Sequence, residues 1–171
     1  DVIRYWAANA RLGADTCYSD HVMKNGKRLV TKLWNAGKFI LSHFDKVEGL
    51  NQPLEWHQIT HTLDKWLFQS LAALTEKVHA HFLAYGYAEA LEAVEKFFWS
   101  VFCDDYLEVS KDRVYKDNLG QSSAIITLYH TFYGLLQLFA PILPHITEEL
   151  AQGIYPNKGS IHQRGNWPQW A

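Results

Sequence analysis

Apolar residues recur every three or four positions along most of the chain, which is the spacing of one face of an α-helix. In one segment the residues at this spacing are Leu91, Val94, Phe98, Val101 and Phe102. No alternating run is long enough to require a β-strand. The pattern predicts six helices, at about residues 1–11, 21–44, 63–84, 88–111, 122–141 and 144–152.

Residues that favour helix termini mark several boundaries of these segments. Asp20 is placed to cap the second helix, and Ser122 or Ser123 to cap the fifth. The last segment, residues 153–171, is rich in Gly and Pro. We expect this tail to be extended, with residues 161–162 in a short strand or an extended piece folded back.

The helix lengths and short connections predict an all-α fold, an antiparallel helical bundle that forms a single domain over residues 1–171. The chain has 171 residues, of which 48% are hydrophobic and 20% charged, and this composition excludes intrinsic disorder. Cys17 and Cys103 are far apart and do not form a CxxC motif. They therefore indicate a reduced compartment and predict a cytoplasmic protein.

One long segment without charge resembles a membrane span at first sight. Residues 118–147 contain no Asp, Glu, Lys or Arg. Polar residues and two prolines interrupt the segment, so that it holds no apolar run of the length that a membrane helix needs. We therefore expect a buried helix and no membrane partner.

Charge is distributed unevenly along the chain. The first 46 residues hold eight Lys or Arg and four Asp, whereas the chain as a whole has a net charge of −2. The predicted second helix has no acidic residue, and its basic residues are Lys24, Lys27, Arg28, Lys32 and Lys38. A polyanion would therefore approach this helix.

A helical wheel of the second helix separates an apolar face from a polar one. The apolar face, expected to meet the core, consists of Val22, Leu29, Leu33, Ala36 and Ile40, extended by Val30, Trp34 and Leu41. The opposite face is a stripe of His21, Asn25, Arg28, Lys32, Asn35 and Phe39. An aromatic ring beside cations and amides suits an unpaired nucleobase, which needs stacking, edge hydrogen bonds and phosphate neutralisation. Alternatively, Phe39 packs against a second neighbouring helix while the lysines remain in solvent.

Other clusters give no catalytic or metal site. Asp104 and Asp105 are adjacent on a helix and therefore point in different directions. Glu76 and His79 have the spacing of a di-metal carboxylate bundle, but that design needs a second Glu-x-x-His pair, which is absent. We expect no catalytic residue, no metal and no cofactor in this chain.

Several strings in order along the chain resemble valyl-tRNA synthetases. They are DVIRYWAA at 1–8, LGADT at 12–16, KLWNAGKF at 32–39, DKWL at 64–67, FCDDYLE at 102–108 and PILPHITEEL at 141–150. The later strings are shared with the isoleucine and leucine enzymes of class I. The strings at 12–16 and 32–39 favour valine.

The resemblance implies a helical anticodon-binding domain that follows a Rossmann catalytic domain, which uses ATP and Mg. The class I signatures His-Ile-Gly-His and Lys-Met-Ser-Lys-Ser are absent here, so this chain alone should not activate valine. In the family, an aromatic residue of the basic helix stacks on an anticodon base and a lysine contacts the anticodon loop. These positions match Phe39 and Lys32. His21 falls where some members carry Arg, and Asp105 where an aromatic residue is common.

We therefore predict that the chain reads the anticodon loop of a tRNA, with the parent chain's catalytic domain as its other partner. The predicted tRNA-binding residues are Lys24, Arg28, Lys32, Asn35 and Phe39. The basic residues would meet phosphates or base edges, Asn35 would offer an amide, and Phe39 a stacking surface. Two alternatives remain, the same domain of an isoleucyl- or leucyl-tRNA synthetase, and a helical module that binds an acidic protein without any RNA role.

Overall fold

The computed structural model describes the chain except for residues 48, 51–52, 117–119, 156–158, 164–166 and 169–171. Its α-helices are α1 (Val2–Ala8), α2 (Asp20–Leu41), α3 (Thr62–Leu83), α4 (Tyr87–Lys96), α5 (Glu108–Tyr115), α6 (Gln121–Phe139) and α7 (Pro144–Ile154). A π-helix, η3 (Phe97–Leu107), joins α4 to α5, and short 3₁₀ turns form η1 (Phe44–Lys46), η2 (Trp56–Gln58) and η5 (Ile161–Gln163). The described residues form no strand, and the predicted all-α bundle is confirmed.

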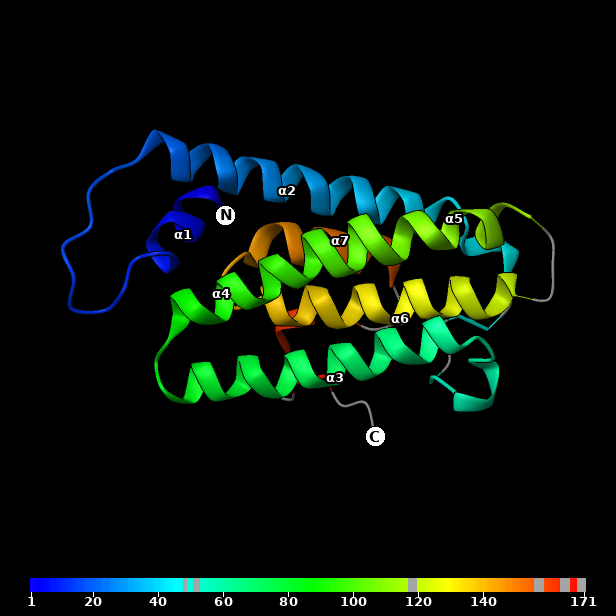
Figure 1. Ribbon diagram of the computed structural model, residues 1–171. Coiled ribbons are helices and arrows are strands. Elements are labelled where there is room, and N and C mark those ends of the chain that lie inside the picture. The colour runs from blue at the N-terminus through cyan, green and yellow to red at the C-terminus, as the bar shows by residue number, and fades with distance from the viewer. Residues whose placement is uncertain (48, 51–52, 117–119, 156–158, 164–166, 169–171) are drawn as a thin grey trace.

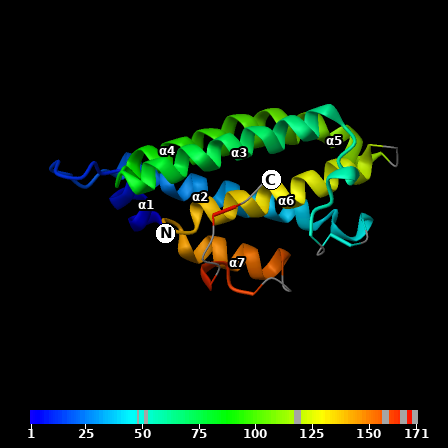
Figure 2. The same cartoon turned by 90° about the horizontal axis from the view of Figure 1, so that it is seen from below.

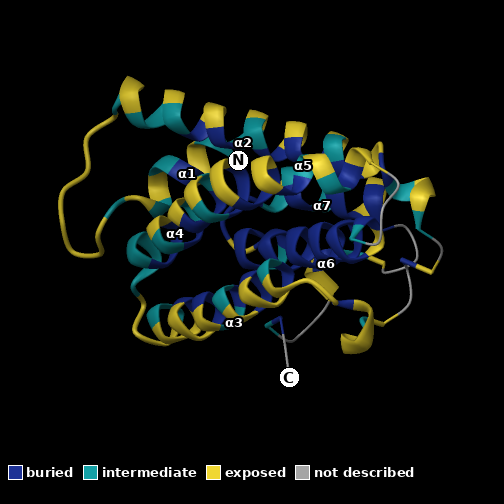
Figure 3. Ribbon diagram, turned by 45° about the vertical axis from the view of Figure 1, so that its right-hand side comes forward, coloured by how far each residue is buried: buried dark blue, intermediate teal, exposed yellow. Residues whose placement is uncertain are grey.

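Helix α6 lies at the centre of the bundle, between α2, α3 and the long helix made of α4, η3 and α5 (Figures 1 and 2). Every residue of α6 except Ser122 and Gln137 is buried, and Figure 3 shows it as the one helix that is dark along its whole length. This burial explains the long segment without charge, because a charged side chain would lose its contact with water at nearly every position of the helix. No helix in the described part of the chain is long and apolar enough to cross a membrane.

Two glycines bring α2 close to its neighbours on the core side. A Cβ at Gly26 would lie 2.8 Å from the ring of Tyr5 on α1, and a Cβ at Gly37 would lie 2.6 Å from Leu150 on α7. Both distances are too short for a real contact, so any larger residue would push the helices apart. These close approaches fix which side of α2 faces inward and which faces solvent.

The predicted segment at 88–111 is one continuous helix that runs from Tyr87 to Tyr115. The 11 residues of η3 in its middle have π-helical geometry. Such geometry occurs mostly as single turns and often at functional sites. Apolar periodicity predicted this helix but gave no indication of the wider π turns.

Several helix ends differ from the prediction. Ser19, not Asp20, caps α2, because its side chain accepts a hydrogen bond from the Val22 amide. The residue before α6 is Gly120 and has no side chain to cap it; Ser123 instead donates to Asp64. The prediction of an extended tail was wrong for residues 153–154, which belong to α7, and for Ile161–Gln163, which is a 3₁₀ turn; residues 156–158, 164–166 and 169–171 lie outside the described residues.

A buried carboxylate, Asp64 at the start of α3, joins four helical segments. It accepts hydrogen bonds from Tyr106 of η3, Arg113 of α5 and Ser123 of α6. The residue is fully buried, and these donors replace the water that the charge has lost. This contact positions α5, and with it Tyr115, beside the end of α2.

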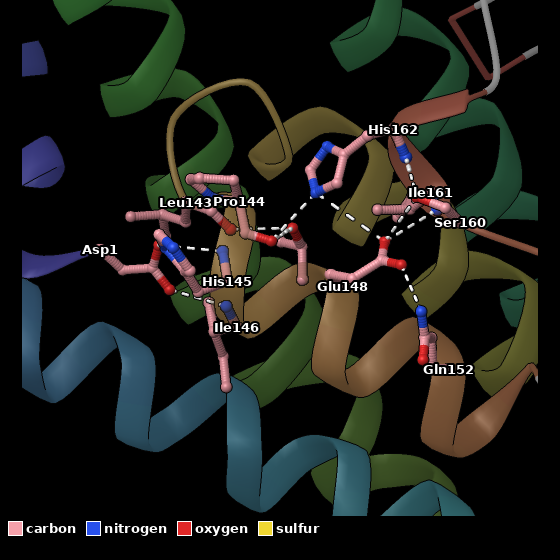
Figure 4. A network of polar contacts seen from close by, with 11 residues as sticks. Asp1, Leu143, Pro144, His145, Ile146, Glu148, Gln152, Ser160, Ile161 and His162 are labelled. Carbon is pink, nitrogen blue, oxygen red and sulfur yellow. Dashed lines mark hydrogen bonds and ion pairs between the residues drawn. The ribbon is translucent and has the colours of Figure 1, made fainter.

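Helix α7 binds both Asp1 and the segment at residues 160–161 (Figure 4). The Asp1 carboxylate accepts from the backbone amides of His145 and Ile146 and so caps the first turn of α7. Glu148, one turn further on, accepts from the Ser160 hydroxyl and the Ile161 amide. The helix therefore fixes where the chain enters the bundle relative to where it leaves α7.

Candidate nucleic-acid interface

The outward face of α2 carries an open groove of about 460 Å³. The groove is lined by Lys24, Lys27, Arg28, Thr31, Lys32 and Asn35 of α2 and by Trp99 of η3. We call it the basic groove, because its lining includes four cations and, within the described part of the chain, no acidic residue. The structure thus brings together Lys24, Arg28, Lys32 and Asn35, four of the five residues predicted from the sequence.

The opposite side of α2 explains why these residues face outward. Leu29, Leu33, Ala36 and Ile40 are buried, as predicted. The predicted extension of this apolar face was wrong for Trp34 and Leu41, which are 39% and 47% exposed, whereas Val30 is half-buried.

Trp99 forms the aromatic part of the groove, a role that the sequence analysis did not predict. The ammonium Nζ of Lys32 lies 5.3 Å from the centre of its ring, the geometry of a cation–π contact. The indole Nε1 donates to Glu95 Oε1 over 3.4 Å. The other oxygen of Glu95 accepts from the Tyr5 hydroxyl of α1 over 2.8 Å. Trp99 and Lys32 lie on different helices, so periodicity within either helix could not predict that they meet.

Phe39 does not line the basic groove. It lies on α2 seven residues beyond Lys32, or about 10 Å along the helix axis. Its half-buried ring packs 4.7 Å from the ring of His43 and 6.3 Å, edge-on, from that of Tyr115. We call Phe39, His43 and Tyr115 the aromatic cluster.

The aromatic cluster combines the two alternatives that the sequence left open for Phe39. The ring does meet a neighbouring helix, yet it retains partial exposure, and Tyr115 beside it is 61% exposed. Lys46 Nζ lies 5.8 Å from the centre of the Tyr115 ring, so the cluster also carries a cation. Apolar and positively charged surface therefore occur together here, as they do in the basic groove.

The remaining candidate residues do not form a site. Asp104 and Asp105 are exposed at the surface of η3. Among the described residues, no three His, Cys, Asp or Glu side chains gather as metal ligands would. Both cysteines are free, Cys17 exposed and Cys103 buried. Burial raises the pKa of the Cys103 thiol to about 12, although the positive charge of Lys32 opposes the shift.

Comparison with known proteins identifies the fold's family. The anticodon-binding domain of tRNA ligases matches residues 64–171, which is more than half of the chain. The chain belongs to this anticodon-binding domain family. The match includes η3 and Trp99 but not α2. The match therefore includes Trp99 of the basic groove but not the groove residues of α2.

Individual relatives extend the similarity to the whole chain. The valine–tRNA ligase of Rickettsia prowazekii is 54% identical over 98% of the chain, and that of Rickettsia felis is 51% identical over 98%. The valine–tRNA ligase of Rickettsia rickettsii is 51% identical over the full chain. The chain spans only 21%, 20% and 22% of these three proteins, respectively, about a fifth of their length.

Proposed function

We propose that the outward face of α2 binds the anticodon loop of a tRNA as part of a valine–tRNA ligase. One observation carries this proposal most directly. Four cations, an amide and an indole line one open groove on a helix that has no acidic residue between Asp20 and Leu41. A single-stranded loop presents phosphates and unstacked bases. The cations can neutralise the phosphates, and the indole can stack on a base.

The groove residues divide into two roles. Lys24, Arg28 and Lys32 neutralise phosphates, since Lys and Arg side chains dominate affinity for nucleic acid. Asn35 offers one donor and one acceptor to a base edge. Outside the groove, Phe39 offers a stacking surface further along α2, with Tyr115 of α5 beside it.

The parent protein supplies what this chain lacks. The relatives' name indicates a ligase that joins valine to tRNA, and we propose that ATP and Mg are used by a catalytic domain outside these 171 residues. The domain described here holds the anticodon loop while the acceptor end reaches that catalytic domain, which is its second partner. A cytoplasmic location follows from a role in translation.

Binding of isolated anticodon stem-loops to the 171-residue chain tests the proposal. The RNA carries a fluorophore on its stem, and anisotropy is measured with stem-loops from valine, isoleucine and leucine tRNAs at several salt concentrations. We expect the valine stem-loop to bind most tightly and its affinity to fall steeply with salt.

Competition separates the alternatives. An acidic peptide of equal charge should displace the RNA poorly, because it cannot stack on an aromatic ring. Displacement at equal concentration, with no preference among the three loops, would favour a site for acidic proteins. Preference for the isoleucine or leucine loop would assign the chain to a different ligase.

A further inference from the structure

Two hydrogen bonds connect the Trp99 side chain, through Glu95, to Tyr5 of α1. Its Nε1 donates to Glu95, one turn before it on the same helix. Glu95 is in turn held by the Tyr5 hydroxyl, which comes from α1. Burial and the acceptor carboxylate of Glu95 raise the pKa of Tyr5 well above its usual value, so the hydroxyl keeps its proton and remains the donor.

The two sides of Trp99 differ strongly in charge. On one side it lines the basic groove with Lys32 and Arg28. On the other it borders a second groove of about 460 Å³, whose lining has three carboxylates, Glu89, Glu92 and Glu95, and two cations, Arg11 and Lys96. A phosphate chain is attracted more strongly to the first side, whose lining among the described residues has four cations and no carboxylate, than to the second. The ring therefore marks the edge of the surface on which an RNA strand can lie.

An ammonium group lies over the ring of Trp99. Lys32 Nζ lies 5.3 Å from the ring centre, and both residues line an open groove. A lysine head group is attached to a flexible chain and moves at little cost. A planar base can take its place over the indole while the ammonium turns to the phosphate of the same nucleotide.

From these contacts we propose that Trp99 is a second nucleobase-stacking site, separate from the aromatic cluster, and that Glu95 and Tyr5 are its positioning residues. The inference rests on the proposed RNA-binding function and assigns it a further site. Phe39 and Lys32 are about 10 Å apart along α2, so the two stacking sites receive different nucleotides of one loop.

The test is a double-mutant cycle between protein and RNA, which isolates a pairwise interaction. Stem-loops with an abasic site at one loop position at a time are bound to the wild-type chain, to Trp99→Ala and to Phe39→Ala. One abasic position should cost roughly 5- to 150-fold in affinity, the range for a stacked base. At that position Trp99→Ala should cause no further loss, whereas Phe39→Ala should still do so.

Two further variants address stability and positioning. Trp99→Phe retains an aromatic face and should recover most of the binding lost in Trp99→Ala. Tyr5→Phe removes only the hydrogen bond to Glu95, and it should weaken binding of the intact loop but not of the loop that is abasic at the Trp99 position. A merely structural role of Tyr5 would weaken both equally.

Trp34 provides a matched control. It lies on α2, is 39% exposed and has Lys38 Nζ at 5.8 Å from its ring, but it is outside the basic groove. Trp34→Ala should change affinity less than twofold. Equal losses from Trp99→Ala with every abasic loop, or a loss from Trp34→Ala as large as that from Trp99→Ala, would overturn the proposal. If the wild-type chain shows no salt-dependent binding of any loop, the proposed function itself fails.

Discussion

Arg113 binds Asp64 through two parallel hydrogen bonds, 3.0 Å from Nη1 to Oδ2 and 2.7 Å from Nη2 to Oδ1. The side chain of Asp64 has no exposed surface, and that of Arg113 is 14% exposed. A two-pronged contact of this kind suits the planar geometry of both groups. It ties α5 to the start of α3 across 49 residues of chain.

We predict that Asp64→Asn lowers the free energy of unfolding by about 3–5 kcal/mol, because it leaves Arg113 as an unpaired charge in a buried site. Urea denaturation measures the loss. Asp112→Asn is the control, since Asp112 is next to Arg113 in sequence and pairs with Lys116 at the surface, where both side chains are more than 60% exposed. The free energy of unfolding of Asp112→Asn should be lower than that of the wild type by about 0.5 kcal/mol or less. Similar losses in both variants would show that the Asp64 contact is no more than a surface ion pair.

We predict that Phe39→Ala weakens binding of the anticodon stem-loop by about 1–3 kcal/mol, the usual cost of losing one stacked base. Because the ring is only half-buried, the free energy of unfolding should fall by less than the about 3–5 kcal/mol typical of a core Phe. Phe44→Ala is a matched control, since Phe44 is also half-buried but packs 5.8 Å from Tyr129 at the core. Normal RNA binding by Phe39→Ala together with a large loss of stability would make Phe39 a core residue.

We predict that Lys32→Gln reduces the slope of log affinity against log salt by about 0.7, the value for one phosphate contact on a single strand. The measurement is anisotropy with the valine stem-loop over a range of salt concentrations. Lys77→Gln on α3 is the control, because Lys77 is exposed but does not line the basic groove. An unchanged slope in Lys32→Gln would exclude a phosphate contact by this side chain.

The sequence predicted most of the helices and most of the groove, and the failures at the groove share one physical cause. A helical wheel gives the direction of a side chain about its own axis, and this suffices for Lys24, Arg28 and Asn35. It does not show which neighbour covers that direction. Trp34 was therefore expected on the core face although it is 39% exposed, and Trp99 was overlooked although it lines the groove.

Asp64 illustrates the same limit for polar residues. In the sequence it is a carboxylate in the first turn of a helix, where the helix dipole alone explains an acidic residue. Its burial depends on Tyr106, Arg113 and Ser123, which approach only when three other segments have packed. Local patterns carry no information about such partners, since each lies more than 40 residues away.

We predict that a maleimide labels one cysteine of the native chain at pH 8 and two in denaturant. Cys17 is exposed, whereas Cys103 is buried and its thiol, with a pKa raised to about 12, stays protonated and unreactive at that pH. Mass spectrometry counts the labels, and Cys17→Ser, which should take up none in the native state, is the control. Rapid labelling of Cys103 in the native chain would contradict its burial beside Lys32.

We predict that acid weakens the attachment of the tail to α7 through Glu148. Partial burial opposes ionisation of this carboxyl group, but hydrogen bonds from Gln152, Ile161 and Ser160 outweigh it and lower its pKa below 4.5. A lowered pKa means that the charged form stabilises the fold. This stabilisation is complete above pH 4.5 and is lost as pH falls through the lowered pKa.

The free energy of unfolding of Glu148→Gln should therefore differ from that of the wild type by about 0.5 kcal/mol at pH 7 and by less at pH 3. The value is modest because water screens a partly exposed group. Urea denaturation at both pH values measures this, with the exposed neighbour Glu149→Gln as control. A difference that grows on acidification would mean that the protonated form of Glu148, rather than the carboxylate, holds Ser160 and Ile161.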